Sequence, residues 1–335
     1  MGKIDGNSSK IGNRLERQKV NFRFVHETRG YLLRIGEEVT NFTQLGRGVR
    51  QGCLLSPLLF SLYAEFMMAE AIDDLEVGIK VGGKLIKDVR FADDQAMIDG
   101  TNEGLQQMMD KLNEKAQEYG MKINIKKTKV MKVSRNGGGE VIIYIDGQRV
   151  EQTDKFKYLG SWLTDDGRCE LEVKCRIAMA KEAFGKRREL LTRSFQRETK
   201  KRIIKSIIWP IMMYGSETWV MKSEECRRIQ AFEMWLWRRM EKIKWTDKVT
   251  NDSVLATVNE KYTLIEKIKK IKKSWIGHVV RGEGLMKEVM EGRMEGKRTR
   301  GRKRISMLQD LLEANNYAYM KKKAEDRERW RAWLP

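Results

Sequence analysis

The sequence has 335 residues, of which 41% are hydrophobic and 34% are charged, and its formal net charge is +20. This length is more than one compact core usually serves, so we expect two or three modules. A globular chain this basic usually meets a polyanion, although charge alone does not separate a nucleic-acid-binding protein from a merely soluble basic one.

Cysteine usage and hydropathy exclude several other classes. The four cysteines have no CxxC spacing, so we expect neither a zinc site nor a disulfide framework, and we expect Cys169 and Cys175 to face a helical core. The N-terminus is polar, and the longest uncharged apolar stretch, 53–64, is too short to span a bilayer. We therefore expect a soluble protein of the cytoplasm or the nucleus, without a membrane partner.

Residues 48–60, which read GVRQGCLLSPLLF, combine glycines with the start of a helix. Ser56 suits an N-cap and Pro57 the first helical turn. The apolar face expected to follow consists of Leu58, Leu59, Leu62, Tyr63 and Phe66. Bare glycine backbone beside a helix N-terminus can approach a nucleotide closely. By itself, an ordinary capped core helix explains the segment equally well.

Residues 84–98, KLIKDVRFADDQAMI, predict two strands with Asp93 and Asp94 at the tip between them. Adjacent carboxylates repel each other unless a cation lies beside them, and Mg²⁺ prefers such hard oxygen ligands. Two metals about 4 Å apart could activate a primer hydroxyl and steady the leaving pyrophosphate. For an isolated Asp-Asp pair, however, a turn without function is the more frequent explanation. We expect both carboxylates to be exposed and close to Gly52.

Three further segments follow in order. An amphipathic helix is predicted over 103–120, with Gly120 suited to its C-terminal cap. Its apolar face consists of Leu105, Met108, Met109, Leu112, Ala116 and Tyr119. A strand is predicted in 121–131, MKINIKKTKVM, and KYLGSWL occupies 157–163.

Together these segments resemble the reverse transcriptases of non-LTR (LINE-type) retrotransposons. GVRQGCLLSPLLFSLY followed by FADD resembles motifs B and C, 121–131 resembles motif D, and 157–163 resembles the motif E primer grip. Later segments resemble the C-terminal region of RTE/BovB-like elements: YGSETWVMK, FEMWLWRRMEKIKWTDKVTN, WIGHVVR and EGKRTRGRKR. The likeness covers nearly the whole chain from about Arg34.

The resemblance implies an α+β fold. We expect a partial reverse-transcriptase palm of antiparallel sheet and helices, followed by an all-helical thumb and a helical C-terminal region. The expected divisions are a poorly defined segment 1–33, the palm 34–164, the thumb-like region 165–245 and the basic C-terminal region 246–335. A strand-rich region beyond Asp166 would contradict this expectation.

The family's activity is RNA-directed DNA synthesis by two-metal nucleotidyl transfer, and it implies roles for particular residues. Asp93 and Asp94 would be catalytic Mg²⁺ ligands, and Lys127, beside Lys126 and Lys129, would donate a proton to pyrophosphate. The residues expected to line the nucleotide and template site are Arg50, Gln51, Gly52, Phe91 and Ala92. Those expected to support the primer end are Tyr158, Leu159 and Gly160.

One element of the family pattern is missing. The palm uses a further aspartate, in an FD-containing strand upstream of GVRQG, and Asp5 is no substitute because it lacks an aromatic neighbour and an apolar strand. We therefore expect a C-terminal fragment that binds Mg²⁺ poorly and is inactive by itself. The alternative is a non-catalytic remnant that binds RNA or RNA–DNA hybrid. A frame-disrupted element copy and a gene begun at a downstream Met would look the same.

Basic residues cluster in 121–135, 181–205, 265–273 and 293–304. These clusters predict contacts to the phosphates of an RNA template, an RNA–DNA hybrid or DNA. The last cluster could grip nucleic acid, direct nuclear import or be solvated, and its candidate residues are Arg298, Arg300, Arg302, Lys303 and Arg304. Among the aromatic residues of 232–243 we expect Phe232 and Trp235 in the core, and Trp237 to point away as a base-stacking candidate.

Overall fold

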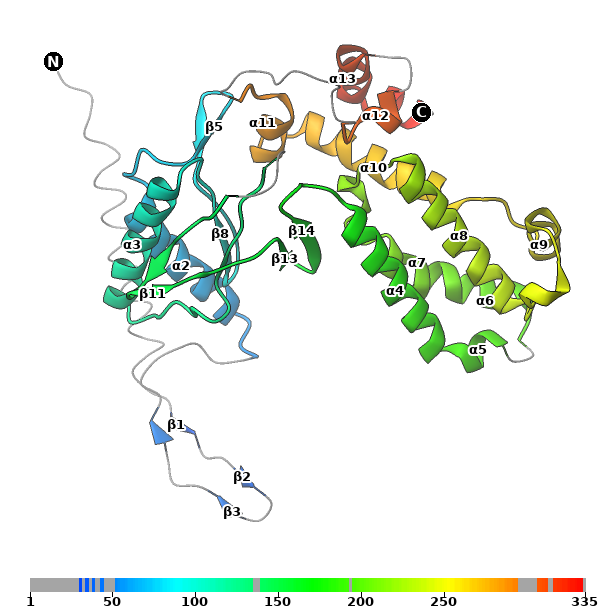
Figure 1. Ribbon diagram of the computed structural model, residues 1–335, viewed down its shortest axis with the longest axis horizontal. Coiled ribbons are helices and arrows are strands. Elements are labelled where there is room, and N and C mark those ends of the chain that lie inside the picture. The colour runs from blue at the N-terminus through cyan, green and yellow to red at the C-terminus, as the bar shows by residue number, and fades with distance from the viewer. Residues whose placement is uncertain are drawn as a thin grey trace. The chain divides into compact units, whose positions relative to one another are not determined.

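The computed structural model describes the short strands within residues 30–44 and then residues 52–134, 139–192, 195–294, 306–312 and 316–333. The chain divides into two compact units (Figure 1). The first comprises 1–78 and 87–123, and the second comprises 79–86 and 124–335. Helices and small, mostly antiparallel sheets make the fold α+β, as expected. The domain boundaries expected after 33, 164 and 245 remain predictions.

The first unit is built from two helices and a hairpin. Helix α2 (Ser56–Ile72) packs on α3 (Asn102–Glu118), and β7 (Asp88–Phe91) pairs antiparallel with β8 (Asp94–Met97). Two further antiparallel pairs precede these elements: β1 (Gly30–Tyr31) with β4 (Thr43–Gln44), and β2 (Arg34–Ile35) with β3 (Glu38–Val39).

Helix α2 departs from its predicted start and face. Its N-cap is Leu55, whereas Ser56 is the first helical residue and is buried, so the predicted Ser56 cap is wrong. Pro57 does lie in the first turn. Leu58 is 58% exposed, and the core shared with α3 is built instead from Met67, Met68, Ala71 and Ile72. The predicted apolar face is therefore wrong at Leu58, because that core begins more than two turns into the helix. The other predicted members, Leu59, Leu62, Tyr63 and Phe66, are half-buried, and Tyr63 packs edge to face on Tyr119.

Helix α3 follows its local signals closely. The Thr101 side chain accepts a hydrogen bond from Gly104 N (3.0 Å), which caps the helix. Gly120, just beyond the C-cap, has φ +67°, a conformation that glycine adopts without strain. Met108, Leu112 and Ala116 are buried against α2, so the predicted amphipathic helix is confirmed.

The strands of the second unit form four small pairs. In chain order the strands are β5 (Ile79–Val81), β6 (Lys84–Ile86), β9 (Lys129–Val130), β10 (Tyr144–Ile145), β11 (Gln148–Arg149), β12 (Glu151–Gln152), β13 (Lys155–Tyr158) and β14 (Ser161–Thr164). Strand β9 pairs parallel with β12, whereas the other three pairs are antiparallel. The strand predicted over 121–131 is thus reduced to Lys129–Val130. The reason is local: the Asn124 carbonyl accepts from Lys127 N (3.0 Å) and Thr128 N (2.9 Å), which closes a turn.

In the described part of the chain after Asp166, every element named is helical, as predicted (Figure 1). The larger helices are α4 (Glu170–Lys186), α6 (Arg197–Ile203), α8 (Ser223–Met240), α9 (Asn251–Val258), α10 (Leu264–Arg281), α11 (Leu285–Glu291), α13 (Tyr317–Glu325) and α14 (Arg327–Ala332). Short elements lie between them: α5 (Arg188–Thr192), η1 (Ile204–Ile208), α7 (Trp209–Met212), η2 (Ser216–Thr218), η3 (Trp245–Asp247) and α12 (Gln309–Leu312). Element η1 is a π-helical turn just before Pro210, which cannot donate the backbone hydrogen bond that a regular α-helix needs there.

The helices share one large core, and it contains Trp237. This side chain is fully buried and meets Trp209 edge to face, with ring centroids 6.3 Å apart. The prediction that Trp237 points away from the core is therefore wrong. Neighbouring helices cover more of the surface of α8 than the single apolar face that helical spacing predicts. Trp235, predicted to be core, is half-buried and packs against this core beside Phe184 and Phe232.

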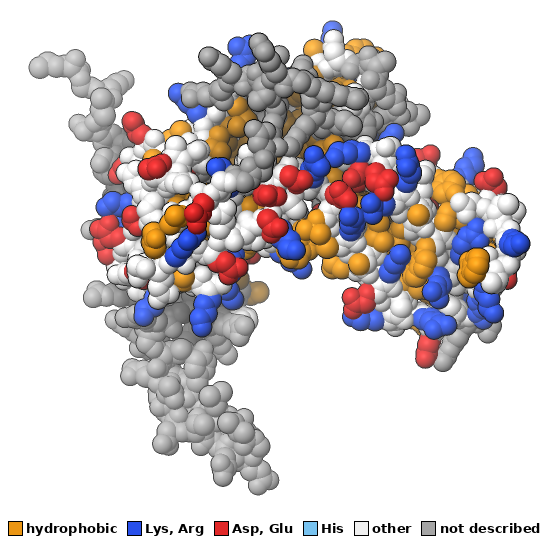
Figure 2. Space-filling view, in the orientation of Figure 1, with side chains coloured by type: hydrophobic (Ala, Val, Ile, Leu, Met, Phe, Trp, Pro, Cys, Tyr) orange, Lys and Arg blue, Asp and Glu red, His pale blue; other side chains and the backbone are white. Residues whose placement is uncertain are grey.

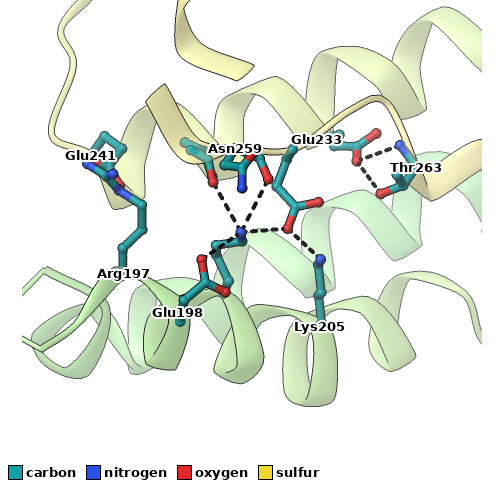
Figure 3. A network of polar contacts seen from close by, with 10 residues as sticks. Arg197, Glu198, Lys205, Glu233, Glu241, Asn259 and Thr263 are labelled. Atoms are coloured by element: carbon teal, nitrogen blue, oxygen red, sulfur yellow. Dashed lines mark hydrogen bonds and ion pairs between the residues drawn. The ribbon is translucent and has the colours of Figure 1, made fainter. Parts of the chain in front are cut away.

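A polar network holds the end of α9 within this bundle (Figure 3). The buried Lys201 ammonium donates to the carbonyls of Val258 (3.1 Å) and Asn259 (3.4 Å) and pairs with Glu260 (3.0 Å). It thereby satisfies carbonyls that the helix leaves without partners. Nearby, the buried Glu233 carboxylate accepts from the backbone N–H groups of Thr263 and Leu264 at the start of α10. Burial raises the pKa of Glu233, and these hydrogen bonds offset part of that effect.

A smaller core joins the second half of α10 to the C-terminal helices. Ile276, Val280, Met320 and Trp330 are buried there. A Cβ at Gly277 would lie 2.1 Å from Trp330 Nε1, so only glycine lets the indole approach α10. The indole N–H donates to the Lys273 carbonyl (3.0 Å).

Candidate active site

The paired carboxylates lie at the tip of the β7–β8 hairpin. Phe91 is paired with Asp94, so the connecting turn consists of Ala92 and Asp93. Ala92 has φ +54°, a left-handed conformation suited to a tight hairpin turn. Asp93 and Asp94 are both exposed, and Phe91 is 64% exposed beside them. The predicted hairpin is therefore confirmed, whereas the nearness of its tip to Gly52 and the roles of these residues stay predictions.

Basic side chains attach this hairpin to α2. Lys87, which precedes β7, donates to the carbonyls of Ile72 (2.8 Å) and Asp73 (2.7 Å) at the C-terminal end of α2. Arg90 on β7 donates to Glu65 of α2 (2.7 Å) and also to Asp88. Sequence reasoning missed these residues, because their contacts join segments that local patterns do not connect.

The carboxylates have the chemistry that Mg²⁺ prefers, but they do not complete a two-metal site. Asp93 and Asp94 supply hard oxygen donors, and Mg²⁺ binds such donors without needing an imidazole or a thiolate ligand. Within the residues that the structure describes, no group of three or more His, Cys, Asp or Glu side chains could hold a metal ion. The described residues therefore bring no third carboxylate beside Asp93 and Asp94.

The nucleotide and template positions are described only in part. Gly52 has φ +85°, and a Cβ placed on it would meet nothing within 4 Å, so its backbone is open as expected. Arg50 and Gln51 lie outside the described residues, as do Arg298, Arg300, Arg302, Lys303 and Arg304. Their predicted contacts to nucleic acid therefore remain predictions.

Lys127 lies in the turn that precedes β9. It is exposed, as is Lys126, whereas Lys129 forms an ion pair with Glu151. Because Lys127 belongs to the second unit and Asp93 to the first, its catalytic role stays a prediction.

The segment that resembles a primer grip forms the β13–β14 hairpin. Tyr158 pairs with Ser161, and the turn residues Leu159 and Gly160 have φ +47° and +84°. Two consecutive left-handed residues are typical of a tight turn that matches the twist of its strands. The structure thus places Tyr158, Leu159 and Gly160 together at the turn of one hairpin. Their contact with a primer stays a prediction.

Three residues missed by sequence reasoning hold this turn on the helical region. Arg176 of α4 donates to the Gly160 carbonyl (2.5 Å), and its guanidinium lies over the Tyr214 ring, 4.4 Å from the centroid. The Tyr214 hydroxyl donates to the Leu159 carbonyl (2.8 Å). Glu172 accepts from Arg176 Nε (2.6 Å) and from Trp162 N (2.7 Å). Only the i, i+4 spacing of Glu172 and Arg176 could have signalled this link.

Cys169 and Cys175 belong to helix α4, the first as its N-cap residue. Cys169 is half-buried, packs against the helical core and donates to the Val220 carbonyl (3.3 Å), and burial raises the pKa of its thiol. Its predicted orientation is therefore confirmed, while Cys175 is half-buried.

In the described part of the chain, no helix has the length and apolar content needed to cross a bilayer.

Comparison with known proteins finds matches over the segment that contains the β7–β8 hairpin. Residues 13–163 match the family described as reverse transcriptase (RNA-dependent DNA polymerase). The chain is 26% identical over 211 residues to an uncharacterized transposon-derived protein of Caenorhabditis elegans. The aligned region covers 61% of this chain and 75% of that protein.

Two retrotransposon polyproteins are similar over the polymerase segment. The chain is 30% identical over 157 residues to a Pol polyprotein from a type-2 retrotransposable element of Drosophila melanogaster, over 44% of this chain. It is 30% identical over 142 residues to a Pol polyprotein from a type-1 retrotransposable element of Nasonia vitripennis, over 39% of this chain. The matches span only 14% of each polyprotein. The family match over residues 13–163 and the two polyproteins therefore support a reverse transcriptase of the non-LTR retrotransposon type.

Proposed function

We propose that the chain is part of the RNA-directed DNA polymerase of an RTE/BovB-like mobile element, and that Asp93 and Asp94 are its Mg²⁺ ligands. The observation that carries the proposal is the β7–β8 hairpin, which presents two adjacent, exposed carboxylates within the segment that matches reverse transcriptases. In a complete site, bound Mg²⁺ would supply electrostatic stabilisation of a primer-hydroxyl attack on a nucleotide.

The chain's own residues would position the nucleic acid around these carboxylates. Arg50, Gln51, Gly52, Phe91 and Ala92 would contact template and incoming nucleotide, with open backbone at Gly52 and an exposed ring at Phe91. Leu159 and Gly160 would support the primer end, because Arg176 and Tyr214 hold their carbonyls in place.

Photo-crosslinking tests this arrangement without requiring catalysis. A DNA primer carrying a photoreactive base at its 3′ end is annealed to RNA, bound to the full chain and irradiated, and crosslinked peptides are mapped by mass spectrometry. We expect crosslinks in 52–60, 88–97 or 155–164. The control carries the photoreactive base deep within the duplex and should shift the crosslinks to other segments. Crosslinks from the primer end that lie only outside the three segments would contradict the proposal.

A second candidate function is binding without chemistry. It is favoured by the net charge of +20 and by the absence of a third carboxylate among the described residues that could complete a metal site. The chain would then hold RNA or RNA–DNA hybrid through phosphate contacts. Crosslinks from the primer end spread over the basic helices, with none at either hairpin, would favour this function.

A further inference from the structure

Trp245 departs from the behaviour of the other tryptophans. Its side chain is 88% exposed, whereas Trp209, Trp219, Trp237 and Trp330 are buried. Removing a large aromatic surface from water is one of the strongest sources of packing energy. An almost wholly exposed tryptophan offers a flat apolar face on which a planar ligand can stack.

The loop that carries Trp245, residues 241–249, is tied to α8 by hydrogen bonds near both of its ends. Ile243 N donates to the Arg238 carbonyl (2.9 Å), and Lys244 N donates to Asp247 Oδ2 (2.8 Å) at the short helix η3. Arg238 also donates to the Val249 carbonyl (2.8 Å) at the far end of the loop. Because both ends are tied to α8, the exposure of Trp245 is a feature of the fold.

Two further observations support this view of the loop. Lys242 and Lys248 are non-glycine residues with φ +60° and +50°, a conformation that the surrounding hydrogen bonds must maintain. Glu241 at the start of the loop is paired with Arg197 of α6, with 2.8 Å between Oε1 and Nε (Figure 3).

The charge around Trp245 is strongly positive. Residues 238–248 contain five basic side chains and two acidic ones, and one of those acids, Glu241, is already neutralised by Arg197. Lys242, Lys244 and Lys248 are exposed and precede or follow Trp245 within six residues of sequence. On the visible face of the helical region, other Lys and Arg side chains are spread among acidic and apolar ones (Figure 2). Loop 241–249 combines three exposed lysines with Trp245, whose side chain is 88% exposed.

We propose that loop 241–249 binds single-stranded RNA, with one unpaired base stacked on Trp245 and neighbouring phosphates held by Lys242, Lys244 and Lys248. Every nucleobase has a flat face that can stack on an aromatic side chain, and lysines along the backbone neutralise phosphate. A duplex is a poor ligand because its bases are already stacked on one another. The choice of RNA rests on the proposed function, in which the template is RNA.

Fluorescence anisotropy with the full chain tests the site. The probes are a labelled, unstructured oligouridylate RNA of roughly a dozen nucleotides and a fully paired RNA duplex of equal length. We expect Trp245→Ala to weaken binding of the single strand about 5- to 100-fold and Trp245→Phe to restore most of the affinity, because an aromatic face remains. Affinity for the duplex should change less than about twofold.

The lysines and a second aromatic residue provide controls. Changing Lys242, Lys244 and Lys248 to Gln should reduce the slope of log affinity against log salt by about two for the single strand. Tyr319→Ala removes another exposed aromatic ring beside a lysine, Lys323, and should leave single-strand affinity unchanged. Since Trp245 is exposed, Trp245→Ala should also leave the unfolding temperature unchanged.

Several results would overturn the proposal. If Trp245→Ala bound the single strand with unchanged affinity, Trp245 would not be a stacking site. An equal loss of affinity for the single strand and the duplex would lead to the same conclusion. Unchanged RNA affinity together with altered self-association in sedimentation would assign the loop to a protein interface instead. These failures differ from failure of the proposed function, because primer-end crosslinks at the two hairpins do not depend on Trp245.

Discussion

At the scale of single residues, the buried ion pair of Glu172 and Arg176 is the most consequential feature. Both side chains are about 95% buried, and together they hold Trp162 N and the Gly160 carbonyl at the β13–β14 hairpin. Removing two charges from water is costly, so such a pair gives little net stability, but losing one partner leaves an uncompensated buried charge.

Arg176→Met should therefore lower the free energy of unfolding of the second unit by about 3–5 kcal/mol. The matched control is Lys174→Met on the same helix, whose exposed pair with Glu170 should contribute less than about 1 kcal/mol. Adding Glu172→Met to Arg176→Met should recover part of the loss, since no buried charge remains. Denaturant titration measures all three variants. Similar small losses for Arg176→Met and Lys174→Met would show that the buried pair does not hold the hairpin.

At the scale of elements, the β7–β8 hairpin carries the candidate chemistry but does not complete it. Lys87 and Arg90 attach the hairpin to α2. The described residues add no third ligand to its two carboxylates. Two-metal nucleotidyl transfer depends on ligands that fix both ions. We therefore expect the hairpin to present both carboxylates but to bind Mg²⁺ weakly.

Primer extension on an RNA template with Mg²⁺ or Mn²⁺ should accordingly show no synthesis by the 335-residue chain above that of Asp93→Ala/Asp94→Ala. The second control is Asp73→Ala/Asp74→Ala, another exposed, adjacent acid pair of the same unit, which makes the same change in charge. Synthesis by the unaltered chain that only the Asp93/Asp94 change abolishes would disprove the expected inactivity. It would mean that another residue completes the metal site.

At the scale of the whole molecule, net charge is the dominant property. With +20 over 335 residues, the chain should bind RNA or RNA–DNA hybrid with low sequence preference, and affinity should fall steeply with salt because bound phosphates release counterions. Residues 1–78 and 87–123 contain 15 Lys and Arg against 18 Asp and Glu, so the excess positive charge belongs to the second unit.

Titrations at several salt concentrations should give a log–log slope of several units for RNA–DNA hybrid. Changing Arg298, Arg300, Arg302, Lys303 and Arg304 to Gln should flatten that slope if these residues touch phosphate. Asp93→Asn/Asp94→Asn should leave binding intact or slightly stronger, because two negative charges are removed. A flat salt response, or loss of binding in the Asp93/Asp94 variant, would contradict an electrostatic mode of binding.

The sequence by itself determined the elements whose signals are local. The hairpin that presents Asp93 and Asp94, the cap of α3 at Gly120 and the helical character of the described chain after Asp166 follow from turn residues, caps and hydrophobic period. The ordered motifs likewise identified the reverse-transcriptase domain that the comparison supports. These features are predictable because each depends on residues a few positions apart.

The tertiary structure alone decided which faces are covered. Periodicity assigned Trp237 to the surface and Leu58 to the core, but neighbouring helices bury Trp237 and α3 leaves Leu58 exposed. The link from Arg176 to the Gly160 carbonyl joins positions 16 residues apart, and that from Tyr214 to the Leu159 carbonyl joins positions 55 apart. Such contacts depend on how helices pack, and helical spacing identifies an apolar stripe without showing which side chains the neighbouring helices leave in water.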